Sequence, residues 1–172
     1  MEINTERLVI KEITDEDVSR IANQAGNNLL KRYISTLDAS DVKALFYDRD
    51  GIKALNDYLN SRVNDAKETS YGAFIGDVMI GYVSLSDINS EMPEVRMELL
   101  PEYQHRGYGY EFLSAIIDKL KREEGPKRLL CLIFPDNKAS IALVEKIGGV
   151  LQSPKSRAEE ILLRIYHIVI DK

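Results

Sequence analysis

Two glycines, Gly107 and Gly109, lie in a loop between a predicted strand and a predicted helix. The strand covers residues 94–100 and ends at Pro101, and apolar residues follow the loop at helical spacing until Gly125-Pro126. The N-terminus of a helix has unpaired N–H groups and about half a positive charge, so it stabilises an anion. Glycine permits close backbone approach and reaches positive φ without strain. The loop could therefore hold phosphate, although an ordinary strand-to-helix turn would explain the glycine pair equally well.

The complete sequence of this loop shows which known phosphate-binding motif it matches. A dinucleotide fingerprint needs a third glycine where Phe112 stands, and a P-loop needs Gly-Lys-Ser/Thr, which the sequence lacks. The string QHRGYG at residues 104–109 instead resembles the Q/R-x-x-G-x-G/A signature of the GNAT acetyltransferase superfamily.

Two further segments narrow this resemblance. TERLVIK at residues 5–11, followed by Asp15-Glu16-Asp17, is similar to the start of the branch containing the ribosomal-protein N-terminal acetyltransferases, the RimJ/RimL-like group. NKAS at 137–140 and EKIG at 145–148 are similar to the N-x-x-S…E-K-x-G-F segment of that branch. The matches occur in the expected order and span nearly the whole chain.

The resemblance implies an acetyl-CoA-dependent N-acetyltransferase that moves an acetyl group to a primary amine by direct attack in a ternary complex. The acceptor would be an amine-bearing small molecule or a protein N-terminus, and a homodimer is the assembly to consider. Val144 stands where many superfamily members carry a tyrosine that serves the leaving group. This departure keeps an alternative open, a non-catalytic module of the same fold that binds coenzyme A or acyl-CoA.

The resemblance also implies which residues bind acetyl-CoA. Backbone N–H groups from His105 to Tyr110 would hold the pyrophosphate, with added charge from Arg106. The end of strand 94–100 would bind the pantetheine arm in a β-like manner, and one of its N–H groups would polarise the acetyl carbonyl. The predicted cofactor-binding residues are Met97, Leu99, Leu100, Gln104, His105, Arg106, Gly107, Tyr108, Gly109, Tyr110, Asn137 and Ser140.

A protonated amine must lose a proton before it attacks, so a carboxylate near the acetyl group is the expected general base. Glu94, Arg96 and Glu98 share one face of their strand, because side chains alternate along a strand. By alignment to the superfamily motif, Glu94 is the predicted base and Glu98 the second candidate. Both carboxylates could instead face solvent and pair with Arg96.

A hydroxyl at Ser140 is the candidate partner of the leaving sulfur, because the RimJ/RimL-like branch often has serine there. A free thiol has a pKa of about 8.5, so the thiolate leaves without full proton donation. Asn137 would contact the pantetheine arm. Asp136, Asn137 and Ser140 could equally serve to cap a helix.

The elements that must position these groups follow from periodicity. Helices are expected from Thr14-Asp15-Glu16-Asp17 to Ala25 and at 29–33, 39–45, 52–64, 110–120 and 137–147, and strands at 8–13, 71–75, 78–85, 95–100, 129–134 and 161–170. Strands 71–75 and 78–85 form a hairpin across Gly76-Asp77. This order predicts an α/β protein with a mixed sheet and helices on both faces. The resemblance implies the GNAT fold, in which strands 94–100 and 129–134 are parallel and splay apart around coenzyme A.

Composition bounds the remaining possibilities. The 172 residues are 44% hydrophobic and 30% charged, which suits one domain over residues 1–172. No apolar run is long enough to span a membrane and the N-terminus is charged, so we expect a cytoplasmic protein without membrane contact. A single cysteine, Cys131, excludes an internal disulfide, and the isolated His105 and His167 predict no metal site.

Charge is unevenly distributed along the chain. Residues 1–90 hold 10 Lys/Arg and 15 Asp/Glu, whereas residues 91–172 hold 13 of each, which together give the net charge of −5. Such a balance argues against a nucleic-acid surface. The acidic N-terminal half could attract a cationic acceptor, or it could simply be a solvated face. Tyr33 and Tyr82 are candidate linings of the acceptor cleft.

Overall fold

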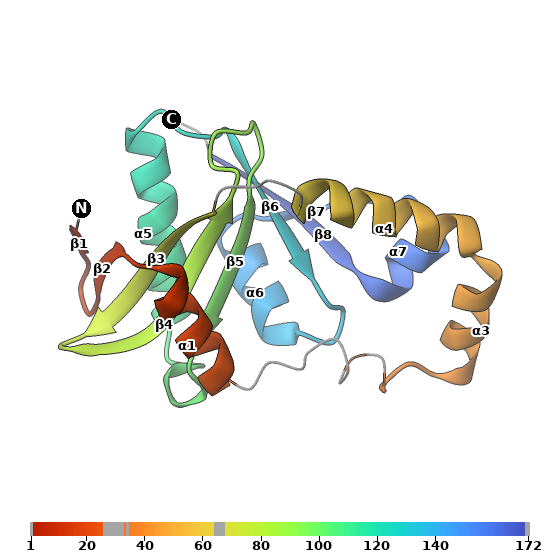
Figure 1. The fold of residues 1–172 in the computed structure, drawn as a ribbon, viewed down its shortest axis with the longest axis horizontal. Helices are drawn as coiled ribbons and strands as arrows, with labels where there is room; N and C mark the ends of the chain where they lie inside the picture. Colours follow the sequence, from red (N-terminus) through yellow and green to blue (C-terminus); the bar gives the residue numbers. More distant parts are fainter. Residues whose placement is uncertain (1, 26–32, 34, 64–67, 171–172) are drawn as a thin grey trace.

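The computed structural model describes residues 2–25, 33, 35–63 and 68–170. Its strands are β1 (Glu2–Asn4), β2 (Val9–Glu12), β3 (Glu68–Ile75), β4 (Val78–Ser86), β5 (Glu94–Leu99), β6 (Arg128–Ile133), β7 (Val150–Leu151) and β8 (Arg164–Val169). Its helices are α1 (Asp15–Ala25), α3 (Ala39–Tyr47), α4 (Arg49–Val63), α5 (Tyr108–Arg122), α6 (Lys138–Lys146) and α7 (Arg157–Leu162), with a 3-10 turn η1 (Pro101–Tyr103). Figure 1 shows their arrangement.

The strands form one mixed sheet in the order β1-β2-β3-β4-β5-β6-β8-β7. Neighbouring strands run antiparallel except β5 and β6, which are parallel. Among the described residues, β5 pairs with β6 only where Glu94 faces Leu130, although both strands continue beyond that point. The predicted pair of parallel strands that splay apart is therefore confirmed.

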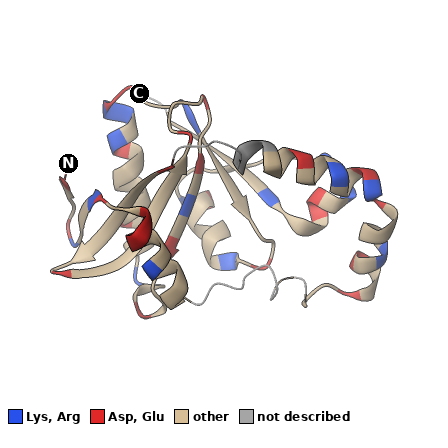
Figure 2. Cartoon of the chain, viewed as in Figure 1, with Lys and Arg blue, Asp and Glu red and all other residues tan. Residues whose placement is uncertain are grey.

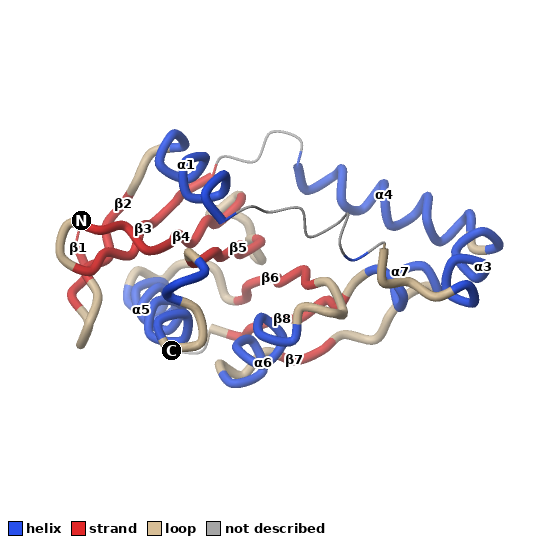
Figure 3. The backbone as a smooth tube through the Cα atoms, turned by 90° about the horizontal axis from the view of Figure 1, so that it is seen from below, coloured by secondary structure: helices blue, strands red, loops and turns tan. Residues whose placement is uncertain are grey.

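Helices cover both faces of the sheet, as predicted (Figure 3). On one face, α5 and α6 contribute to the main core, where Phe112 and Ile116 of α5 are fully buried against β-strand residues such as Val83 and Leu129. On the other face, Ile21 of α1 packs in a small cluster beside β4, and α4 packs over β6 and β8 in another. The main core spans both β5 and β6, whereas on the other face the α1 cluster and the α4 cluster are separate.

Local signals explain where several elements begin. Thr14 and Asp17 bond reciprocally at the start of α1, with Thr14 N 3.2 Å from Asp17 Oδ2 and Asp17 N 3.3 Å from Thr14 Oγ1. This is the capping arrangement expected of the sequence. The hairpin between β3 and β4 turns at Gly76, which adopts a φ of 58°. Both predictions are confirmed.

The predicted strand at 161–170 is wrong at its start. Residues 157–162 form helix α7, and the strand begins at Arg164. Ser156 caps this helix by accepting a hydrogen bond from Glu159 N at 3.0 Å, and Asp48 accepts another from Ala158 N at 2.6 Å. The Ser-x-x-Glu pattern was therefore a helix signal that outweighed the apolar run after it.

Two very short strands, β1 and β7, were not predicted, because neither is long enough to show alternation. The helix expected at 29–33 falls, apart from Tyr33, outside the described residues.

Candidate active site

The loop between β5 and α5 is held in a glycine-dependent shape. Gly107 is the N-cap of α5 and has a φ of 84°, a left-handed value that L side chains rarely adopt. The first backbone bond of the helix runs from Glu111 N to Gly107 O at 3.1 Å. The N–H groups of Tyr108, Gly109 and Tyr110 precede it and have no intrahelical acceptor. Such unpaired donors are the groups with which a helix N-terminus can bind an anion, and their contact with phosphate stays a prediction.

Gly109 packs closely against two neighbouring elements. A Cβ there would lie 3.2 Å from Met97 Cε of β5 and 3.4 Å from Leu143 Cδ2 of α6. A larger residue would therefore make these two side-chain ends shift by a few tenths of an ångström. Gln104 anchors the other end of the loop, donating from Nε2 to Leu99 O at 2.9 Å.

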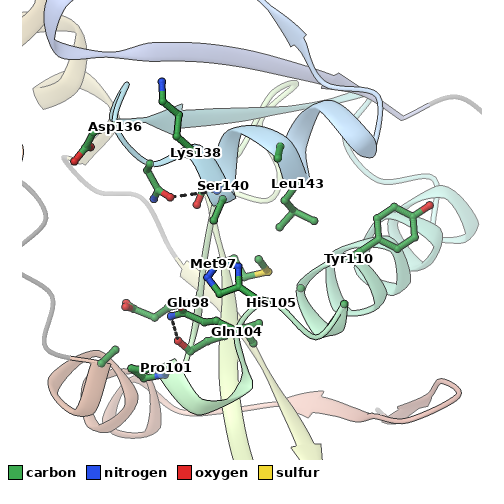
Figure 4. A pocket seen from close by; sticks show the side chains of 17 residues that line it. Met97, Glu98, Pro101, Gln104, His105, Tyr110, Asp136, Lys138, Ser140 and Leu143 are labelled. Carbon is green, nitrogen blue, oxygen red and sulfur yellow. Dashed lines mark hydrogen bonds between the residues drawn. The ribbon is translucent and has the colours of Figure 1, made fainter.

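A cavity of about 870 Å³ opens at this point, where β5, the glycine loop, α5 and α6 meet (Figure 4). Its lining consists of Ala25, Met97, Glu98, Leu99, Pro101, Gln104, His105, Gly107, Gly109, Tyr110, Asp136, Asn137, Lys138, Ala139, Ser140, Ala142 and Leu143. The size is that of a site for a cofactor or a small molecule.

Most residues predicted to bind the cofactor line this cavity, and three do not. Leu100 is buried beside Ile21, and its N–H donates to Ile80 O at 2.8 Å. Arg106 and Tyr108 both contact Arg7, which is not in the lining either: Arg106 through its carbonyl oxygen and Tyr108 through its ring. Any contact of these three with the cofactor remains a prediction.

The start of α6 forms the opposite wall. Asn137 caps the helix, accepting a hydrogen bond at Oδ1 from Ser140 N at 3.2 Å. The capping role considered for Asn137 is thus observed, while Ser140 itself is half-buried and lines the cavity. Asp136 and Lys138 also line it, and neither is among the predicted cofactor-binding residues, although Asp136 precedes the matched segment at 137–140 and Lys138 lies within it.

The two candidate bases lie at opposite ends of β5. Glu98 lines the cavity, whereas Glu94 is not in its lining. They are four positions apart along the strand, a distance of about 13 Å. The Glu94 side chain is 15% exposed, and its Oε1 is 3.8 Å from Arg96 Nε. Strand alternation predicts that both side chains lie on the same face of β5. The two differ in that only Glu98 lies beside the cavity.

Tyr82 stands beside Glu98 on the neighbouring strand. The two residues are paired across β4 and β5, and the Tyr82 hydroxyl is 3.5 Å from Glu98 Oε2. Burial, followed by the negative charge of Glu98, raises the pKa of Tyr82, so this phenol is protonated near neutrality. It can therefore donate a hydrogen bond toward the carboxylate.

Cys131 lies in β6 and is 4% exposed. Burial, with a smaller contribution from Glu94, raises its pKa to about 12. Because the thiolate is the reactive form, this cysteine is a core residue and not a nucleophile.

Val144 and Tyr33 serve packing contacts. Val144, at the position where many superfamily members have tyrosine, is 5% exposed and belongs to the main core. The Tyr33 hydroxyl donates to Ile161 O of α7, and its ring stacks on Phe134 at 5.4 Å. Tyr33 is not in the lining of the cavity, so an acceptor role for it stays a prediction.

Within residues 2–25, 33, 35–63 and 68–170, no group of three or more His, Cys, Asp or Glu side chains is placed to hold a metal ion. No helix in this part of the chain is long and apolar enough to cross a membrane.

Comparison with known proteins agrees with this geometry. Residues 7–150 match the family described as an acetyltransferase (GNAT) domain. YoaA of Bacillus subtilis (strain 168), named an uncharacterized N-acetyltransferase, is 26% identical over 164 residues, covering 87% of this chain and 85% of YoaA. RimL, a ribosomal L7/L12 alpha-N-protein acetyltransferase solved with coenzyme A, superposes with a TM-score of 0.65 at 19% identity over 99% of both chains. A chimera of the spermidine N-acetyltransferase SpeG from Vibrio cholerae and hSSAT superposes with a TM-score of 0.64 at 16% identity over 96% of both chains.

The diverging parallel strands and the glycine loop beside them define an α/β protein of the GNAT class. The family match covers most of the sequence, so the chain belongs to the GNAT acetyltransferase family and is an acetyltransferase. The likeness to RimL confirms, at the level of the fold, the resemblance drawn from residues 5–11 and 137–148.

Proposed function

We propose that this protein is an acetyl-CoA-dependent N-acetyltransferase that transfers the acetyl group to a primary amine in a ternary complex. One observation carries the proposal: a single cavity joins the N-terminus of α5 to the carboxylate of Glu98. Residues 1–172 act as one domain in this proposal. A homodimer stays a prediction, which sedimentation analysis tests.

The chain supplies two sets of backbone groups for the cofactor. The free N–H groups of Tyr108, Gly109 and Tyr110 would bind its pyrophosphate. Beyond Glu94, β5 diverges from β6, so the edge of β5 from Met97 to Leu99 would accept an extended ligand in the manner of an added strand, apart from Leu99 O, which already accepts a hydrogen bond from Gln104 Nε2. Bound acetyl-CoA would supply the acetyl group as a thioester.

Glu98 is the proposed general base, in place of the Glu94 favoured by motif alignment, because Glu98 lines the cavity. It would accept the proton of the ammonium directly or through one water, and Tyr82 would orient its carboxylate. A backbone N–H of β5 would polarise the carbonyl that the amine attacks.

The Ser140 hydroxyl would donate to the leaving sulfur as the carbon–sulfur bond breaks. The buried and protonated Cys131 is unsuited to form an acyl-enzyme, which favours direct attack by the amine.

The acceptor we propose is an α-amine or a polyamine-like cation. Glu98 and Asp136 both line the cavity and would stabilise a cation there. Figure 2 shows acidic and basic positions interspersed along α3, α4 and α7, so the carboxylates of the cavity are the more specific source of attraction. RimL acts on the α-amine of a ribosomal protein and SpeG on spermidine, by their names.

Turnover tests the proposal. Release of coenzyme A from acetyl-CoA should be measured with free-N-terminus peptides, polyamines and aminoglycosides at low and high salt. We expect turnover on cationic amines with a kcat/KM that falls as ionic strength rises, because screening weakens attraction over about 10 Å at 0.1 M salt. Turnover on neutral or anionic amines alone, or no effect of salt, contradicts the acceptor class.

A non-catalytic coenzyme A binding module is the second candidate, favoured by valine in place of tyrosine at position 144. Both candidates bind the cofactor. Binding of coenzyme A without turnover on any amine of the panel would support the non-catalytic module.

A further inference from the structure

The turn between β1 and β2 packs against the glycine loop and the first turn of α5. Thr5 N donates to Leu8 O at 2.9 Å and Leu8 N to Thr5 Oγ1 at 3.0 Å, which makes the turn rigid. From this turn, Thr5 Oγ1 lies 2.5 Å from Glu111 Oε1, and Arg7 N donates to the same oxygen at 2.8 Å. Glu111 lies in the first turn of α5. The N-terminal motif thus reaches the start of the helix that would hold the cofactor.

Arg7 makes most of the contacts between the turn and the loop. Its Nε is 2.7 Å from Glu111 Oε2, and its Nη1 donates to Arg106 O at 3.0 Å. The guanidinium lies over the Tyr108 ring, 4.4 Å from the centroid. A Cβ on Gly107 would be 3.2 Å from Nη2. A planar guanidinium therefore holds the loop at Arg106 and Tyr108 together.

The charges in this cluster bear on anion binding. Burial raises the pKa of Glu111, but hydrogen bonds from Thr5 and Arg7, with the Arg7 charge, outweigh it and hold the pKa below its usual value. Glu111 is therefore ionised at neutral pH, close to the helix N-terminus that would bind phosphate. An uncompensated carboxylate there would repel an anion, and Arg7 neutralises it.

We propose that Arg7 is a positioning residue for cofactor binding. With Thr5 and Glu111 it fixes the backbone from Arg106 to Tyr108, so that the free N–H groups of α5 face the cavity. Neither Arg7 nor Glu111 is in the lining of the cavity, which separates this role from direct contact with phosphate. The proposal rests on the proposed function in one respect, that the ligand of the loop is coenzyme A.

Four variants test this role: Arg7→Ala, Arg7→Lys, Glu111→Gln and the double variant Arg7→Ala/Glu111→Gln. Lys53→Ala is the matched control, since it removes an exposed ion pair with Asp57 on α4, away from the cavity. Calorimetry would give the Kd for coenzyme A, and kinetics the KM for acetyl-CoA and kcat.

We expect Arg7→Ala and Glu111→Gln each to weaken binding by about tenfold, with kcat changed much less. The double variant should be no weaker than Arg7→Ala, because coupled residues are not additive. Arg7→Lys should recover part of the loss, and the control should bind normally. Tighter binding in Glu111→Gln beside weaker binding in Arg7→Ala would instead identify Arg7 as a direct phosphate ligand and overturn the proposal, as would unchanged binding in both.

Hydrogen exchange without ligand separates this proposal from the proposed function. Faster exchange of the amides of Glu111 to Leu113 in Arg7→Ala, and not in the control, would support the positioning role whatever the loop binds. If the wild-type protein then bound no coenzyme A, the proposed function would be wrong, but the role of Arg7 in fixing the loop would still be supported. Unchanged exchange in Arg7→Ala would reject the positioning role.

Discussion

Tyr82 and Glu98 face each other across β4 and β5, with the phenol oxygen 3.5 Å from Glu98 Oε2, at the edge of the cavity beside the glycine loop. The pair lies past the point where β5 diverges from β6. In the proposed mechanism, a carboxylate there would meet both the acceptor amine and a thioester held along β5. No other glutamate of β5 has this position, because Glu94 lies where the two strands are still paired.

Glu98→Gln should lower kcat/KM by about 10² to 10⁴, the usual scale for a general base, with little change in cofactor affinity. The loss should shrink as pH rises, because the amine then deprotonates unaided. Glu94→Gln is the matched control on the same strand and should cost far less. Steady-state rates across pH measure both, and a larger loss at Glu94 would restore the assignment made from the motif.

Gly107→Val should abolish the rise in melting temperature that acetyl-CoA gives the wild-type protein by mass action. Gly107 has a φ of 84°, so a side chain there strains the loop, and its Cβ would lie only 3.2 Å from Arg7 Nη2. Gly76→Val is the control, because Gly76 also has a positive φ, 58°, but a Cβ there meets nothing within 4 Å. Both variants should lose some intrinsic stability, and only Gly107→Val should lose the response. If a folded Gly107→Val variant were stabilised by acetyl-CoA as much as the wild-type protein, the loop would not be the pyrophosphate site.

Ser140→Ala should reduce kcat by a modest factor, because one hydrogen bond to a leaving group is worth about 1–3 kcal/mol at most. The capping bond uses the backbone N–H of Ser140, so the helix should keep its stability. Asn137→Ala removes that cap and should lower the free energy of unfolding by about 1 kcal/mol. Rates and chemical denaturation of the two variants separate the roles. An unchanged kcat in Ser140→Ala would leave Ser140 as a helix residue only.

Glu111 should make stability depend on pH on the acidic side. Its folded-state pKa lies below its ordinary value, so its contribution is fully present above the unfolded pKa and is lost as pH falls through the folded pKa. The melting temperature of the wild-type protein should therefore exceed that of Glu111→Gln at neutral pH. This difference should narrow as pH falls through about 4 and below. A difference that stays constant over this range would show that the ionised carboxylate is not what stabilises the turn.

Much of the local structure was predictable from sequence. The glycine loop, the hairpin at Gly76-Asp77 and the cap at Thr14 and Asp17 each depend on a few neighbouring residues, so their signals survive without tertiary context. Ser156 and Glu159 form a capping signal of the same kind at the start of α7, but the apolar run that follows them predicts a strand. Family resemblance added the parallel pair of strands and the region of the cofactor site.

Only the tertiary structure decided which groups meet. Alternation places the side chains of Glu94 and Glu98 on the same face of the strand, so the sequence pattern cannot distinguish the two residues. The packing of the strands does distinguish them. In the described part of the chain β5 pairs with β6 only at Glu94, and the cavity lies farther along β5, beside Glu98. Arg7 and Glu111 are 104 residues apart and become partners because β1, β2 and the start of α5 meet at one edge of the sheet. Such contacts depend on how elements pack, and packing is a property of the whole chain that no short segment encodes.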